Sequence, residues 1–119
     1  MKRIVLLVIF IAVFLMACAS SNSNQQNSTI TIVNRTGFTV FFVYFSPVAD
    51  NYWGPNRLRS NQVLRNGQSV TLPLPHPLNV TNRYDFRLVD LDGDSYIKQN
   101  ILVTNNSAII FTFSDFVGR

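Results

Sequence analysis

Three aspartates, Asp90, Asp92 and Asp94, stand at alternate positions around a glycine. Ca²⁺ prefers oxygen ligands and takes about six to eight of them, so this spacing could begin a calcium-binding loop. An EF-hand loop also requires a bidentate Glu at its twelfth position, and the corresponding residue counted from Asp90 is Ile101. An Asp-Gly pair between two strand-like segments is sufficient for a tight hairpin turn. The pattern therefore predicts a turn, with a calcium site as the alternative.

A second candidate site is the segment 51–57, which contains the only tryptophan of the chain. Tyr52 and Trp53 are rigid aromatic side chains that bury a large area at a low entropic cost. Such side chains can stack on a sugar ring or anchor a protein partner, and Arg57 can add a cationic hydrogen-bond donor. The alternative, which we favour at this point, is that Trp53 closes the open end of a β-sandwich.

The sequence offers no recognisable catalytic machinery. His76 is the only histidine and lies between two prolines, and the chain contains no glutamate. No Gly-x-Ser-x-Gly nucleophile elbow is present either. We therefore expect a protein that is not an enzyme and that uses no cofactor.

The N-terminal segment is typical of an export signal. Lys2 and Arg3 are followed by residues 4–16, none of which has a polar side chain. Thirteen residues of helix span about 20 Å, which is shorter than the roughly 30 Å hydrocarbon core of a bilayer. A cleaved signal peptide over residues 1–17 is therefore favoured over a permanent membrane span.

The end of this segment, Leu15-Met16-Ala17-Cys18, resembles the lipobox of bacterial lipoproteins. The resemblance implies that Cys18 receives a diacylglycerol on its thiol, that the chain is cleaved before Cys18, and that the new amino terminus is acylated. Two or three acyl chains would give a long-lived attachment, because each buried CH₂ contributes roughly 0.8 kcal/mol. Cys18 is the only cysteine, so no internal disulfide is possible.

Residues 19–28 are polar or small and uncharged, so residues 18–28 are predicted to be a lipidated cysteine followed by a flexible tether. In enterobacteria an Asp directly after the cysteine tends to retain a lipoprotein in the inner membrane. This chain has Ala19 there, which favours the outer membrane, facing the periplasm, if the source is Gram-negative. Lys2 and Arg3 contribute two of the four net positive charges, and the remaining bases are scattered, which argues against nucleic-acid binding.

From residue 29 to 117 the pattern is that of β-strands, without a segment of helical periodicity. Ile30 and Ile32 alternate with threonines, as in a strand with one buried face. Residues 38–45 are mostly aromatic or β-branched on both faces, which predicts a central strand, and three prolines make 72–78 an edge or connector. The predicted strands are 29–32, 38–45, 63–65, 68–72, 84–91, 94–103 and 108–113, the last with Ile109, Phe111 and Phe113 on one face.

Two turns of the Asn-Gly and Asp-Gly type predict hairpins, one at Asn66-Gly67 and one at Asp92-Gly93. A two-residue turn at the second would pair Leu88 with Ile97, Phe86 with Gln99 and Tyr84 with Ile101. The core face would then hold Tyr84, Phe86, Leu88, Ile97 and Ile101, and the water-facing side Asp85, Arg87 and Lys98. The whole pattern predicts an all-β fold, a small antiparallel β-sandwich of six to seven strands, with a partly closed β-barrel as the alternative.

Five further segments run in order along nearly the whole predicted β domain: Asn34-Arg35-Thr36-Gly37, Tyr44-Phe45-Ser46-Pro47, Trp53-Gly54-Pro55-Asn56-Arg57-Leu58, Leu64-Arg65-Asn66-Gly67-Gln68-Ser69 and Tyr84-Asp85-Phe86-Arg87-Leu88. In these segments and their order the domain resembles a group of small exported bacterial proteins, many of them lipoproteins. The resemblance implies a single β domain and no particular activity, and the paired cysteines of some of those proteins are missing here.

These observations predict a lipid-anchored lipoprotein of the bacterial cell envelope whose β domain is a non-catalytic binding or assembly module. Its partners would be the membrane, through the lipid on Cys18, and an envelope protein or glycan. One alternative is a periplasmic inhibitor or glycan-binding protein that uses Tyr52, Trp53 and Arg57. The other is a calcium-dependent adhesion domain that uses the three aspartates of the Asp-Gly turn.

Overall fold

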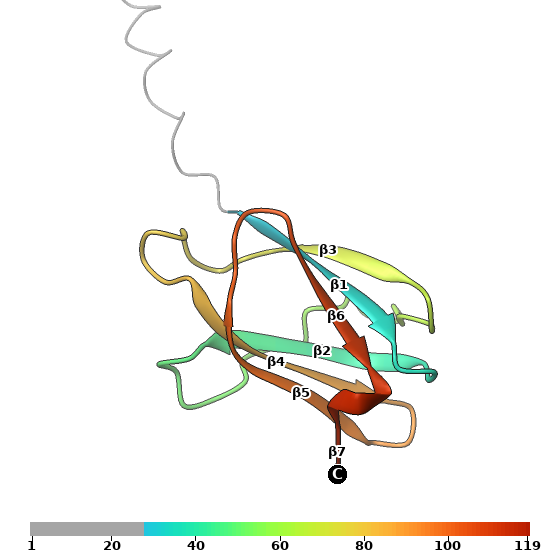
Figure 1. The fold of residues 1–119 in the computed structure, drawn as a ribbon. Coiled ribbons are helices and arrows are strands. Elements are labelled where there is room, and N and C mark those ends of the chain that lie inside the picture. Colours follow the sequence, from blue (N-terminus) through green and yellow to red (C-terminus); the bar gives the residue numbers. More distant parts are fainter. Residues whose placement is uncertain (1–27) are drawn as a thin grey trace, which may run out of the picture.

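The computed structural model describes residues 28–119. The predicted signal peptide, Cys18 and all of the predicted tether except Ser28 lie outside this range. The described residues form two β-sheets that pack face to face around one hydrophobic core (Figure 1). The elements are β1 (Thr29–Arg35), β2 (Val40–Pro47), β3 (Ser69–Pro73), β4 (Arg83–Asp90), β5 (Ser95–Leu102), β6 (Ser107–Thr112), the 3₁₀ helix η1 (Phe113–Asp115) and β7 (Phe116–Gly118).

The strands are ordered β3-β1-β6 in one sheet and β2-β4-β5-β7 in the other. Neighbouring strands are antiparallel except β1 and β6, which are parallel. The turn before β6 is held beside the start of β1, because the Asn106 amide donates to the Thr29 carbonyl at 2.8 Å and the Thr29 amide donates to Asn105 Oδ1 at 3.2 Å. The predicted all-β sandwich is thus confirmed, with one parallel pair, and the sheets of residues 28–119 do not close into a barrel.

Strand β1 is longer than predicted. Ile30 and Ile32 are fully buried, as their alternation indicates, but the strand continues beyond the predicted end at residue 32, through Asn34 and Arg35. The Asn34 side chain is buried and donates to the carbonyls of Phe38 and Leu64, each at 2.8 Å. A residue type that favours turns therefore serves here as a buried anchor that fixes the bend after β1.

The prediction that residues 38–45 form a central strand is wrong, because β2 is the edge strand of its sheet. Its free edge is covered by the following loop: the Val43 amide donates to Asn56 Oδ1 at 3.0 Å, and the Arg57 amide donates to the Val43 carbonyl at 2.7 Å. A bulge between Val40 and Phe42 lets Val40 and Val43 both point inward. On the outer face, Phe42 is exposed and Tyr44 is half-buried.

The predicted hairpin at Asn66-Gly67 is also wrong, although the turn itself forms. Gly67 has a φ of 88°, and the Gln68 amide donates to the Arg65 carbonyl at 2.9 Å. Leu64, before the turn, forms a bridge with Val40 of β2, whereas β3, after the turn, pairs with β1. The turn therefore carries the chain from one sheet to the other instead of joining two paired strands.

The hairpin of β4 and β5 forms as predicted, but most of its register differs by one residue. Tyr84 does pair with Ile101, whereas Leu88 pairs with Tyr96 and Phe86 pairs with Lys98. The turn is longer than two residues, since it is closed by the Asp90 amide, which donates to the carbonyl of Asp94 at 3.0 Å. A bulge between Tyr84 and Phe86 absorbs the difference.

In the first half of β5 this one-residue slip reverses which side chains face the core, while Tyr84, Phe86 and Leu88 of β4 are buried as predicted. Tyr96 is fully buried in place of Ile97. Lys98, which we expected on the water-facing side, lies on the Phe86 side instead, where its Nζ contacts Asp115 Oδ1 at 3.1 Å and sits 5.7 Å from the centre of the Phe111 ring. The register differs from the predicted one because the turn is longer than two residues, and the Asp-Gly pair alone does not determine the length of a turn.

The end of the chain departs from the predicted last strand in one respect. Ile109 and Phe111 of β6 are buried as expected, but Phe113 is 55% exposed. The chain leaves the sheet at Thr112, whose side chain caps the 3₁₀ helix η1, and then adds the short strand β7 to the other sheet. Among residues 28–119, no helix has the length and apolar character needed to cross a membrane.

Candidate functional site

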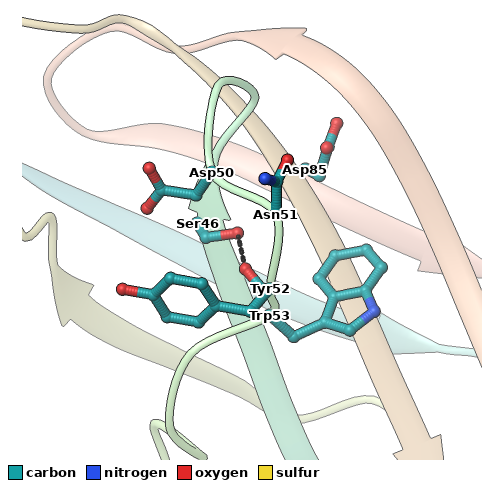
Figure 2. A pocket seen from close by; sticks show the side chains of 6 residues that line it. All are labelled: Ser46, Asp50, Asn51, Tyr52, Trp53 and Asp85. Atoms are coloured by element: carbon teal, nitrogen blue, oxygen red, sulfur yellow. Dashed lines mark hydrogen bonds between the residues drawn. The ribbon is translucent and has the colours of Figure 1, made fainter.

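A cavity of about 190 Å³ opens between the end of β2 and the loop that follows it (Figure 2). The Ser46 hydroxyl donates to the Tyr52 carbonyl at 2.9 Å and so holds this loop against the strand. Asp85 comes from β4, directly opposite Ser46 in the strand register. The lining residues are Ser46, Asp50, Asn51, Tyr52, Trp53 and Asp85, and we call this cavity the Trp53 pocket.

The Trp53 pocket combines aromatic surface with polar groups that accept hydrogen bonds. Figure 2 shows the rings of Tyr52 and Trp53 pointing to opposite sides of the loop, with the two carboxyl groups and the Asn51 amide above them. One oxygen of Asp85 accepts the Asn100 amide at 2.8 Å. Pockets that enclose whole drug-sized ligands have about 300–1,000 Å³, so this one fits a single ring or end group of a larger ligand.

Trp53 lies on the outer face of the four-stranded sheet, not inside the sandwich. It is half-buried and does not belong to the core cluster of residues 28–119. Its ring centre lies 6.0 Å from the guanidinium carbon of Arg87, a residue on the outward side of β4. The role that we favoured from the sequence, closing the open end of the sandwich, does not fit this position.

Arg57 is separated from the Trp53 pocket. Its guanidinium lies 4.5 Å from the centre of the buried Phe45 ring, and Nη2 donates to the Phe45 carbonyl at 2.8 Å. Burial lowers the pKa of Arg57, and its Nε is buried without a hydrogen-bond partner. The structure thus brings Tyr52 and Trp53 to one site and uses Arg57 to fasten the loop to the core.

Three residues of the Trp53 pocket, Ser46, Asp50 and Asp85, lie outside the segment 51–57 that the sequence indicated. Asp50 directly precedes that segment, so its proximity along the chain was the available signal. Asp85 lies in another strand, and only the pairing of β2 with β4 reveals that it faces the loop.

The three aspartates of the Asp-Gly turn do lie together, with one carboxylate oxygen from each within 4.8 Å of the others. Asp90 is buried, and its Oδ1 accepts the amides of Asp92 and Asp94 at 2.9 and 3.0 Å. Its Oδ2 accepts the hydroxyl of the buried Tyr96 at 2.9 Å, and burial together with this bond raises the pKa of Tyr96. These contacts support the turn as the role of Asp90, while calcium binding stays a prediction.

We expect added calcium to leave the melting temperature of the protein unchanged. Both oxygens of Asp90 already accept hydrogen bonds from the protein, and Asp94 Oδ1 contacts Arg119 Nε at 3.3 Å. A ligand that binds only the folded state would raise the melting temperature with its concentration. Thermal unfolding in EDTA and in millimolar CaCl₂ checks this, with MgCl₂ as the control, and a rise specific to calcium would restore the calcium hypothesis.

No known protein family, curated protein or solved structure matches this chain. The chemistry of the site therefore has to be argued from its own residues. Two aromatic rings, two carboxylates, an amide and a hydroxyl around a small open cavity suit a ligand with a flat apolar face and several hydroxyl groups.

Proposed function

We propose that this protein is a lipid-anchored protein of the bacterial cell envelope whose β-sandwich is a non-catalytic, glycan-binding module. The observation that carries the proposal is the composition of the Trp53 pocket. A sugar ring presents apolar C–H groups on its face and hydroxyl groups at its edge. Trp53 and Tyr52 each offer an aromatic surface for such a face, on opposite sides of the loop, and Asp50 and Asp85 offer acceptors for the hydroxyl groups.

The lipid anchor is supported by the Leu15-Met16-Ala17-Cys18 sequence and by the apolar segment before it. An anchor on Cys18, with Ala19 after it, favours the outer membrane facing the periplasm if the source is Gram-negative. The chain enters β1 at the same end of the sandwich from which the loop after β2 emerges (Figure 1). The Trp53 pocket would therefore stay near the membrane surface, since eleven fully extended residues, 18–28, span at most about 40 Å.

The non-catalytic part of the proposal is supported by the surroundings of His76, the only histidine. It is exposed within the proline-rich connector after β3 and is not among the residues that line the Trp53 pocket. The two carboxylates of the pocket could in principle hydrolyse a glycosidic bond, because glycosidases use such a pair. The test below therefore includes a search for cleavage products.

Trp53 is the only tryptophan, so fluorescence excited selectively at tryptophan, and not at the four tyrosines, reports on this pocket alone. We expect its emission to change and saturate when the full-length protein in detergent is titrated with soluble peptidoglycan fragments. Asp50→Ala should weaken the response, whereas Arg65→Ala, an exposed change in the turn between the sheets, should not. No saturable change would contradict glycan binding, and smaller fragments in the chromatogram after titration would contradict the non-catalytic role.

A further inference from the structure

A continuous row of side chains crosses the outer face of the four-stranded sheet and begins at Trp53. The Arg87 guanidinium carbon lies 6.0 Å from the centre of the Trp53 ring and 5.8 Å from the centre of the Tyr44 ring. Tyr44 stacks on Phe42, with 6.2 Å between ring centres and 10° between ring planes. We call Trp53, Arg87, Tyr44 and Phe42 the outer row. Phe42 is 41% exposed, so the row is open to solvent at its far end.

A second cavity, of about 460 Å³, lies at the Phe42 end of the outer row. Its aromatic wall is formed by Phe41 and Phe42, and the rest of its lining is mostly polar. The outer row therefore joins two cavities that each combine aromatic surface with hydrogen-bonding groups. The other residues that line the second cavity are Asn56, Arg59, Ser60, Asn61, Gln62 and Val63.

Arg87, in the middle of the outer row, has no carboxylate partner in the part of the chain that the structure describes. Its Nε donates to Ser95 Oγ at 3.1 Å, and the ion pairs within residues 28–119, Lys98 with Asp115 and Arg119 with Asp94, do not include it. A half-buried guanidinium between two rings is a strong site for a planar carboxylate, which it can bind through two parallel hydrogen bonds.

We propose that the outer row and the two cavities form one extended site for an oligosaccharide that carries carboxylate groups. One sugar unit would occupy each cavity, the units between them would lie along the aromatic rings, and a carboxylate would bind Arg87. Each contact along the row spans about 6 Å, a step comparable with one sugar unit. This proposal rests on the proposed function, because it takes the Trp53 pocket as one end of the site.

The first arm of the test varies ligand length. Calorimetric titration of the full-length protein in detergent would use peptide-free glycan fragments of alternating N-acetylglucosamine and N-acetylmuramic acid, from two to eight units. We expect the affinity to be at least about tenfold higher for the longer fragments than for the disaccharide, which corresponds to additional contacts worth about 1.4 kcal/mol. Phe42→Ala should remove that gain and leave disaccharide binding unchanged. Phe113→Ala, which changes another exposed phenylalanine outside the row, should keep the gain.

The second arm varies charge. Arg87→Gln should weaken binding of the carboxylate-bearing fragments about tenfold and leave binding of neutral N-acetylglucosamine oligomers of equal length unchanged, while Arg83→Gln on the same strand should change neither. Thermal unfolding confirms that each variant is folded. Equal affinity at all lengths, or no effect of Phe42→Ala and Arg87→Gln, would overturn the extended site and leave the Trp53 pocket standing. Absence of binding to every glycan, or binding to peptide alone, would overturn both proposals.

Discussion

Replacement of Cys18 by serine is expected to abolish lipidation, so that the protein is either released from the membrane fraction or retained as an uncleaved precursor. In the proposed anchor the diacylglycerol would be joined to Cys18 through a thioether, which a serine hydroxyl cannot provide. Without this modification, we expect neither normal cleavage of the signal peptide nor attachment through acyl chains.

The measurement is fractionation of cells that express wild-type protein or Cys18→Ser, with a carbonate wash of the membranes and detection of the protein by immunoblot. We expect wild type in the washed membranes, and the variant either in the soluble fraction or retained as an uncleaved, larger precursor. Ser21→Ala, a neighbouring change in the predicted tether, is the matched control. Normal processing and unchanged membrane association of Cys18→Ser would contradict the lipid anchor.

Asp90→Ala is expected to reduce the free energy of unfolding by about 3–5 kcal/mol, because it removes a charged acceptor of three hydrogen bonds and strands a buried hydroxyl. The donors are the amides of Asp92 and Asp94 and the hydroxyl of Tyr96, which is fully buried. Small domains have about 5–15 kcal/mol of stability, so this loss is a large part of the total.

Urea denaturation in EDTA measures this loss without a contribution from metal ions. Asp90→Asn keeps an oxygen for the two backbone amides, so its cost should be smaller. Asp92→Ala changes an exposed side chain of the same turn and should cost less than about 0.5 kcal/mol. Equal losses for Asp90→Ala and Asp92→Ala would contradict the structural role that the contacts of Asp90 indicate.

The local sequence pattern predicted those features of the fold that are determined by residues close together in the sequence. The alternation around Ile30 and Ile32 identified the buried face of β1, and Asn66-Gly67 identified a turn. The pattern did not predict which segments pair across that turn, because pairing depends on the bridge between Leu64 and Val40 and on the ladder of β1 with β3. Those contacts join residues that are far apart in the sequence.

Two errors in the predicted sandwich have the same physical cause. Backbone hydrogen-bonding groups can find partners outside a neighbouring strand. The apolar segment of β2 indicated a central strand, but the Asn56 side chain and the Arg57 amide cover its edge. In the β4–β5 hairpin the side chain of Asp90 accepts two turn amides, which lengthens the turn and shifts the register. Side-chain acceptors of this kind leave no periodic signal.

The candidate site was predictable in its aromatic half only. Tyr52 and Trp53 stand out by residue type, and both line the pocket. Arg57 belongs to the same segment, yet its guanidinium packs on Phe45, because its backbone amide donates to the Val43 carbonyl and so holds the residue against the edge of β2. Asp85 was predicted on the correct face of the sheet, but its partners could not be identified without the pairing of β2 and β4.

The most direct test of glycan binding at the Trp53 pocket is co-sedimentation of the full-length protein, in detergent, with purified insoluble peptidoglycan. We predict that wild type and Arg65→Ala sediment with the glycan, and that Trp53→Ala, with unchanged thermal stability, stays in the supernatant, since loss of a central aromatic contact costs about 2 kcal/mol or more. Equal sedimentation of Trp53→Ala and wild type, or a wild-type protein that never sediments, would contradict the account.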